Sequence, residues 1–171
     1  MNYFNQETAR LQLRRLTLDD IPTWTEFFVN NDRLKYLGID LTKDHETLAT
    51  EWILSQLKRY ENQGLGFLAA IEKKSGNFIG LGGILPRDIN NEVLYEIAYS
   101  LKPEFWGKGY ATEIAKQMSV FCFESKLAAK TISIIHKENS DSIKVAQKNG
   151  MKILYDIEDY LGMNVHVFGT E

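Results

Sequence analysis

Six consecutive residues, Trp106-Gly107-Lys108-Gly109-Tyr110-Ala111, form a glycine-rich segment between a run typical of a strand and a run typical of a helix. A glycine-rich turn that opens a helix leaves backbone N–H groups without partners, with the positive end of the helix dipole behind them. Such a turn suits a phosphate or pyrophosphate. The segment therefore predicts an anion site. The alternative is that the glycines serve only a tight turn and Trp106 only the core.

Glu96 is the acidic residue whose position suits acid–base chemistry. It lies in the strand-like run 93–101, on the same face as Leu94 and Ala98. Burial between apolar neighbours raises the pKa of a carboxyl group, which would help it accept a proton from an attacking amine. Two other interpretations stay open: a solvated glutamate on a sheet face, or a residue that only orients the amine.

The elements that must position these residues follow from hydrophobic spacing and turn residues. The pattern predicts a single domain over residues 1–171, with about four helices and seven strands in the order β-α-α-β-β-β-α-β-α-β-β. Short gaps favour antiparallel pairing, so we expect an α+β fold with a mixed, mostly antiparallel sheet. The expected strands are residues 10–16, 66–72, 78–85, 93–101, 131–135, 152–157 and 163–168. One expected helix begins after Thr17, and the other three span residues 44–64, 109–125 and 140–149.

Composition narrows the class of protein. The net charge of −3 provides no general attraction to nucleic acid or to an anionic membrane, and no long apolar run occurs, so we expect a cytoplasmic protein. Cys122, the only cysteine, falls on the apolar face of its helix and is expected to pack in the core. His45, His136 and His166 fall in different elements, so no metal site is expected.

Several motifs together resemble one family. The chain is similar to the GNAT N-acetyltransferases, and within them to the branch of ribosomal-protein alanine N-acetyltransferases (Rim type), over roughly residues 10–168. The resemblance implies the GNAT fold and transfer of an acetyl group from acetyl-CoA to an amine. The motifs that carry it are Glu96-Ile97-Ala98-Tyr99-Ser100-Leu101, then Pro103 to Glu113, Asn139-Ser140-Asp141-Ser142 and Lys148-Asn149-Gly150-Met151.

The resemblance also implies how acetyl-CoA would bind. Its pyrophosphate would be held by backbone N–H groups from about Gly107 to Thr112, and its pantetheine arm would hydrogen-bond the edge of the strand at Ile97 to Tyr99. Trp106 occupies a position where the family pattern has Gln or Arg. The implied cofactor-binding residues are Ile97, Ala98, Tyr99, Trp106, Gly107, Lys108, Gly109, Tyr110, Ala111, Thr112, Asn139 and Ser142.

The departing thiolate needs a hydrogen bond or a proton. Many GNAT enzymes use a tyrosine of the second-motif helix, but no tyrosine occurs between Asn139 and Gly150. The resemblance implies that Asn139 contacts the pantetheine and that Ser142 donates a hydrogen bond to the sulfur. Glu96, Ser142 and Asn139 are therefore the expected catalytic residues. The alternative for Asn139 and Ser142 is helix capping.

The acceptor is left open as a protein N-terminal α-amine or a small-molecule amine, and the assembly as a monomer or homodimer. A CoA-binding sensor or scaffold without catalysis is the alternative function. Aromatic residues of the first helix and near the C-terminus are candidates for the acceptor groove or for core packing: Trp24, Phe27, Phe28, Tyr155 and Tyr160.

Overall fold

The computed structural model describes all residues from 1 to 171 and has the α+β architecture that the sequence predicts, with eight strands and four α-helices. The strands are β1 Asn5–Glu7, β2 Leu11–Arg14, β3 Gly66–Glu72, β4 Phe78–Ile89, β5 Glu92–Leu101, β6 Ile132–His136, β7 Lys152–Tyr160 and β8 Met163–Gly169. The helices are α1 Ile21–Thr25, α2 His45–Gln63, α3 Tyr110–Glu124 and α4 Ser140–Lys148.

The predicted count of seven strands was one too few, because β1 was missed. This strand is only three residues long, and its sequence Asn-Gln-Glu shows no alternation of apolar residues. It adds an edge strand that pairs antiparallel with β2. After Thr17, where a helix was predicted, the chain forms a 3-10 turn, Leu18–Asp20, then the short α1 and a second 3-10 turn, Glu26–Phe28.

All eight strands form one sheet in the order β1-β2-β3-β4-β5-β6-β8-β7. Every neighbouring pair is antiparallel except β5 and β6. Those two strands are parallel and pair at a single position, Glu96 with Ile132. Because β5 remains paired with β4 along its whole length, the sheet opens into a gap between β5 and β6.

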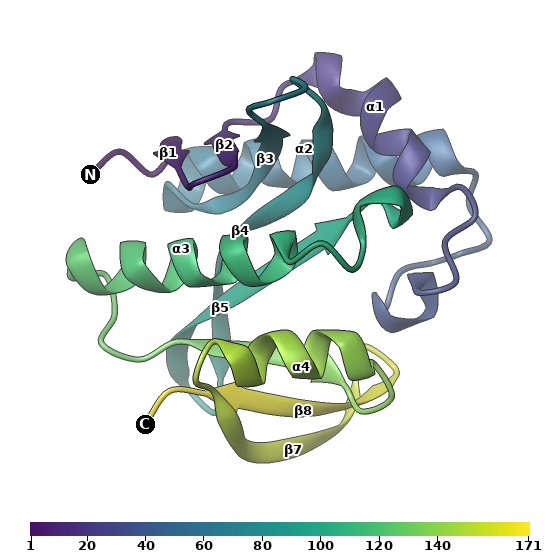
Figure 1. Cartoon of the computed structure of the whole chain (residues 1–171). Helices are drawn as coiled ribbons and strands as arrows, with labels where there is room; N and C mark the ends of the chain where they lie inside the picture. The colour runs from purple at the N-terminus through teal and green to yellow at the C-terminus, as the bar shows by residue number, and fades with distance from the viewer.

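Helices cover both faces of the sheet, with α3 and α4 in front of the strands and α2 behind them (Figure 1). Gly82 of β4 faces Ile114 of α3, while Gly66 of β3 lies against Gln56 and Tyr60 of α2. The main hydrophobic core fills the spaces between these layers. Tyr99 pairs with Gly82, so its side chain lies on the α3 and α4 face; Glu96, three residues earlier, lies on the α2 face.

The limits of α2 are where the sequence predicts them. Asp44 is the N-cap, and its carboxylate accepts the backbone N–H of Thr47 at 2.9 Å. Gly64 ends the helix in the left-handed region, with φ of 65°. A capping box forms after β2, where the Asp20 carboxylate accepts the N–H of Thr17 at 2.8 Å.

The turn between β4 and β5 is shorter than predicted. Residues 86–91 were expected to form it, but β4 continues to Ile89 and only Asn90 and Asn91 form the turn, with φ of 53° and 63°. Asparagine tolerates the left-handed region, and two such residues match the twist of a tight hairpin. The longer strand places Arg87 within reach of Glu96.

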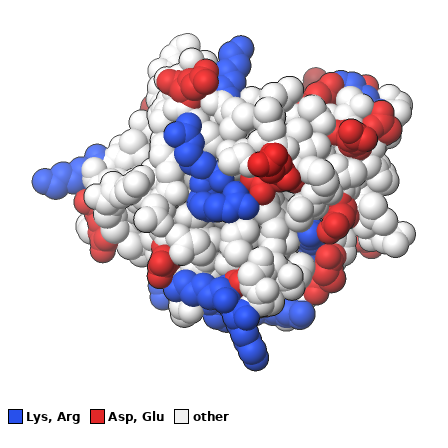
Figure 2. All heavy atoms as spheres, turned by 90° about the horizontal axis from the view of Figure 1, so that it is seen from above, with Lys and Arg blue, Asp and Glu red and all other residues white.

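The surface carries charges of both signs. Lys and Arg side chains are interspersed with Asp and Glu on the face seen in Figure 2, as the small net charge suggests. No helix of the structure is long and apolar enough to cross a membrane.

Candidate active site

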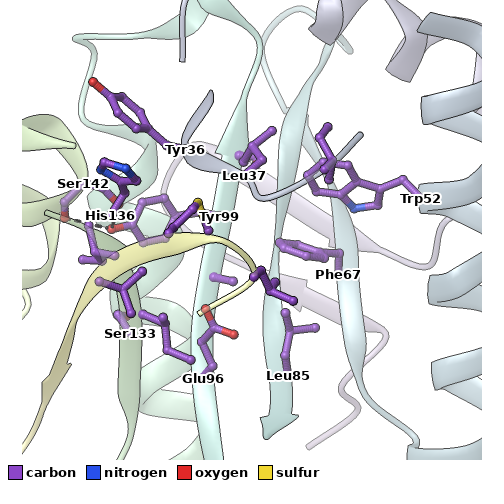
Figure 3. Close-up of a pocket in the computed structure, with 18 of the residues that line it drawn as sticks. Tyr36, Leu37, Trp52, Phe67, Leu85, Glu96, Tyr99, Ser133, His136 and Ser142 are labelled. Atoms are coloured by element: carbon purple, nitrogen blue, oxygen red, sulfur yellow. Dashed lines mark hydrogen bonds between the residues drawn. The ribbon is translucent and has the colours of Figure 1, made fainter. Parts of the chain in front are cut away.

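Two cavities meet at the gap between β5 and β6. The first, which we call the acceptor cavity, has a volume of about 510 Å³ and is lined by residues of α2, the β4–β5 hairpin, β6 and the β7–β8 hairpin (Figure 3). The second, the donor cavity, has a volume of about 450 Å³ and lies at the glycine-rich segment and the start of α4. Residues that line both are Tyr36, Leu37, Tyr99, Ser100, Asn139 and Ser142.

The glycine-rich segment has the geometry of an anion site. Gly107 and Gly109 have φ of 74° and 83°, values that residues other than glycine rarely adopt. The first N–H engaged in an α3 hydrogen bond is that of Glu113, which donates to the Gly109 carbonyl at 3.1 Å. None of the N–H groups from Gly107 to Thr112 donates a hydrogen bond within the chain, and all of these residues except Lys108 line the donor cavity.

Arg10, near the N-terminus, forms hydrogen bonds at the glycine-rich segment and the first turn of α3. Its Nη1 donates to the Lys108 carbonyl at 2.9 Å, and its Nε donates to the Glu113 carboxylate at 2.7 Å. The guanidinium also lies 4.1 Å from the centre of the Tyr110 ring. Sequence reasoning missed this residue because its contacts are about a hundred positions away along the chain and follow no local spacing.

Loss of the Arg10 contacts should loosen the segment without removing any N–H donor. We expect Arg10→Ala to weaken CoA binding by roughly tenfold, since two charge-assisted hydrogen bonds of this partly exposed side chain are lost. Equilibrium titration with CoA measures the change. Lys73→Ala, which removes the ion pair with Glu7 of β1, is the control and should bind CoA as the parent does. Equal affinity in both variants would show that Arg10 does not position the segment.

Trp106 lines the donor cavity, and two contacts fix the position of its side chain. Its indole Nε1 donates to the Leu101 carbonyl at 2.9 Å, and the guanidinium of Arg33 lies 3.6 Å from the ring centre. Arg33 also pairs with Asp141 at the start of α4. The tryptophan therefore joins the end of β5 to the loop that follows α1. Lys108 does not line the cavity and lies over Phe105, whereas Lys144 and Lys148 of α4 do line it.

The open edge of β5 is narrower than the predicted Ile97 to Tyr99. The Ile97 carbonyl already accepts the Ser133 hydroxyl of β6 at 2.8 Å. Peptide groups alternate in direction along a strand, so those of Ala98 face β4 and those of Tyr99 face the gap. Tyr99 is beyond the single pairing of β5 with β6, so its backbone groups have no partner in β6.

A hydroxyl pair lies at the junction of the two cavities. The Tyr99 hydroxyl is 3.0 Å from the Ser142 Oγ and 3.1 Å from the Ser142 carbonyl oxygen (Figure 3). Burial raises the pKa of Tyr99 to about 12, against the smaller lowering effect of the Ser142 hydrogen bond. The phenol therefore keeps its proton at neutral pH. Sequence reasoning had assigned Tyr99 a backbone role only.

Asn139 is the N-cap of α4, as the capping interpretation predicts. Its side-chain oxygen Oδ1 accepts the N–H of Ser142 at 3.3 Å. The capping bond uses only Oδ1, so the amide nitrogen Nδ2 remains a donor beside both cavities. A cap and a ligand contact are thus compatible in this residue.

Glu96 is buried, with 7% of its surface exposed, and lines the acceptor cavity. Its carboxylate accepts a hydrogen bond from Arg87 Nε at 2.6 Å. Burial raises the pKa of Glu96, and the Arg87 charge opposes that effect only in part. Figure 3 shows the carboxyl group directed into the cavity. Glu96 and Tyr99 point to opposite faces of β5, because they are three residues apart in the strand.

The remaining candidates lie in the core, at the cavities or outside both. Trp24, Phe27 and Phe28 are buried in the main core, as the packing interpretation predicts, although Phe27 also borders the donor cavity. Tyr160 lines the acceptor cavity and Tyr155 does not. Burial raises the pKa of the Cys122 thiol to about 12, so this cysteine is not poised as a nucleophile.

The three histidines have different side-chain neighbours, although His136 and His166 lie on the paired strands β6 and β8. His45 stacks on Phe28, His136 lies against Tyr36, and His166 contacts Asp156 at 2.6 Å. No group of three or more His, Cys, Asp or Glu side chains has the arrangement that would hold a metal ion.

Comparison with known proteins gives the class of this site. A family model described as an acetyltransferase (GNAT) domain matches residues 10–152. YkkB of Bacillus subtilis (strain 168) is 30% identical over 84% of this chain and 83% of its own length. The chain belongs to the GNAT acetyltransferase family, and the class of enzyme that the sequence predicts, an acetyl-CoA-dependent N-acetyltransferase, is confirmed.

Solved structures show the same fold. A putative ribosomal-protein-serine acetyltransferase from Vibrio cholerae has a TM-score of 0.80 at 19% identity, covering 99% of this chain and 98% of its own. RimL, a ribosomal L7/L12 alpha-N-protein acetyltransferase in complex with Coenzyme A, has a TM-score of 0.77 at 13% identity, covering 95% and 94%. Both structures share the fold of this chain over nearly its whole length.

Proposed function

We propose that the protein transfers the acetyl group of acetyl-CoA to a primary amine, either a protein N-terminal α-amine or a small-molecule amine, by direct attack in a ternary complex. The observation that carries the proposal is the meeting of the two cavities at the gap in the sheet. Acetyl-CoA reaches the gap from the α3 and α4 face, and the amine reaches it from the α2 face. The residues also fit the cofactor, because free N–H donors are aligned where a pyrophosphate would lie.

Glu96 accepts the proton of the attacking amine, directly or through a water. An α-amine has a reference pKa of about 8, so most of it is protonated at neutral pH and must lose a proton before it attacks. A buried carboxylate with a raised pKa is suited to take that proton. The Tyr99 backbone N–H, facing the gap, polarises the thioester carbonyl. The neutral nitrogen then forms a bond to the thioester carbon, the C–S bond breaks, and the thiolate departs beside the Tyr99–Ser142 pair. The proton that the new amide nitrogen loses neutralises the thiolate.

The test is release of coenzyme A thiol from acetyl-CoA in the presence of a panel of amines and N-terminal peptides, with mass spectrometry of the acetylated product. Release that depends on the amine supports the proposal. Binding of CoA without release for any amine would favour the non-catalytic sensor or scaffold instead. The same panel decides between a peptide N-terminus and a small amine as acceptor.

Ser142 is expected to affect the chemical step rather than cofactor binding. Ser142→Ala removes the hydroxyl that lies 3.0 Å from the Tyr99 phenol and should lower kcat by roughly tenfold, since one hydrogen bond to a developing thiolate is lost. The affinity for CoA should change much less. Steady-state kinetics and CoA titration separate the two effects. Ser125→Ala, at the far end of α3, is the matched control. A kcat equal to that of the control would exclude Ser142 from thiolate stabilisation.

A further inference from the structure

Arg59 is the one charged side chain of the acceptor cavity that lacks a partner. It projects from α2 and lines the cavity, yet it takes part in no ion pair and no side-chain hydrogen bond. The other charged residues of the lining are satisfied. Glu96 pairs with Arg87 at 2.6 Å, Glu51 pairs with Lys43 at 2.9 Å, and the Asp40 carboxylate accepts hydrogen bonds from Thr42.

The surroundings of Arg59 make an added anion favourable. The side chain is partly buried, and burial followed by the charge of Arg87 lowers its pKa. Both effects oppose the positive charge, and Glu96 offsets them only from a distance because its carboxylate is bound to Arg87. A guanidinium offers a planar set of donors that matches a carboxylate or phosphate in two parallel hydrogen bonds. A ligand that brings such a group would supply the missing counter-charge.

We propose that Arg59 binds an anionic group of the acceptor, and that the acceptor is a small primary amine carrying a carboxylate or a phosphate-type group. This inference rests on the proposed acetyl transfer and names the class of amine. Arg59 is then a substrate-binding residue, while the amine itself lies toward Glu96 and the gap. The cavity volume of about 510 Å³ is in the range of small-molecule sites.

A protein N-terminus fits this arrangement less well. The first residue of a protein chain continues into a neutral peptide bond, so it presents no carboxylate next to its amine. Arg59 would then stay without a counter-charge in a partly buried position, which carries a desolvation cost. The β7–β8 hairpin also borders the cavity, through Tyr160, Leu161 and Met163.

The experiment compares acids with matched amides. Coenzyme A release is measured with several free amino acids, with their C-terminal amides and with aminoethylphosphonate. We expect the parent protein to favour the anionic amines by tenfold or more in kcat/KM, mainly through KM. In Arg59→Gln this preference should fall at least tenfold, and Arg59→Lys should retain part of it because it keeps the charge but loses the planar donors. The carboxylate and phosphonate arms show which anion is recognised.

Lys58→Gln is the control, because it removes the same charge from the next position of α2 on the exposed side. It should keep the preference for anionic amines. The proposal is overturned if the parent shows no such preference, if Arg59→Gln slows acids and amides by the same factor, or if peptide N-termini are the better acceptors.

A binding measurement separates this inference from the proposed function. Calorimetric titration with N-acetyl amino acids and their amides needs no turnover. If no amine releases coenzyme A but the N-acetyl acids bind and lose affinity at least tenfold in Arg59→Gln, the acetyl-transfer proposal fails and the anion site stands. If amines are acetylated but acids bind no better than amides, the anion site fails alone.

Discussion

Replacing Glu96 by glutamine is expected to lower kcat at neutral pH by about 100-fold or more, and by less at high pH. The carboxylate accepts the amine proton only when it is ionised, so the parent rate should fall as the pH drops through the raised pKa of Glu96. Glutamine cannot take the proton, and the rate of the variant then follows the fraction of amine that is already neutral. The pH dependence of kcat with a single amine measures both effects.

Two further variants make this result specific. Glu92→Gln lies at the exposed start of the same strand and should leave the pH profile as it is. Arg87→Met removes the positive charge that opposes the raised pKa of Glu96, so the acidic limb of the profile should move to higher pH. A Glu96→Gln profile with the same shape as that of the parent would remove Glu96 from the role of base.

Replacing Gly109 by valine is expected to abolish CoA binding, with an increase in the dissociation constant of 100-fold or more, while the protein remains folded. Gly109 has φ of 83°, where a β-branched side chain is strongly disfavoured, so the backbone must change its direction at the N-cap of α3. A change there turns the free N–H groups of residues 107–112 away from the donor cavity. CoA titration and thermal unfolding are the two measurements.

Gly76→Val provides a matched control for that strain. Gly76 lies in the β3–β4 turn with φ of 74°, and a Cβ atom there would meet no other atom within 4 Å. Its valine variant should lose a similar amount of stability, roughly 1–3 kcal/mol, because both positions force a left-handed backbone on valine. CoA affinity should stay at the parent value. Comparable loss of CoA affinity in the two variants would mean that general destabilisation explains the result.

Local sequence signals predicted the elements that position the site. The α2 limits, the glycine turn and the cap at Asn139 depend on residues within a few positions of each other, where capping and backbone preferences act directly. The segments that carry the donor cavity were therefore placed close to where the structure has them. Strand β1 was missed because its stability comes from pairing with β2 rather than from its own residues.

Local sequence signals could not predict the contacts between segments that are distant in the sequence. Two examples depend on how strands and helices pack against one another. Arg10 donates hydrogen bonds to Lys108 and Glu113. The Tyr99 hydroxyl lies within hydrogen-bond distance of Ser142. The Arg87–Glu96 pair depends on where the β4–β5 turn falls, and a turn of six residues instead of two would have kept Arg87 off the strand. Such side chains share no spacing with their partners.

The gap between β5 and β6 has a consequence for the stability of the protein in the cell. Only one residue pair joins the part of the sheet that carries β1 to β5 with the part that carries β6 to β8. A pantetheine arm in the gap would restore hydrogen bonds that the sheet itself lacks, so cofactor binding also adds to the free energy of unfolding. The resistance of this protein to heat and proteolysis should then follow the supply of coenzyme A.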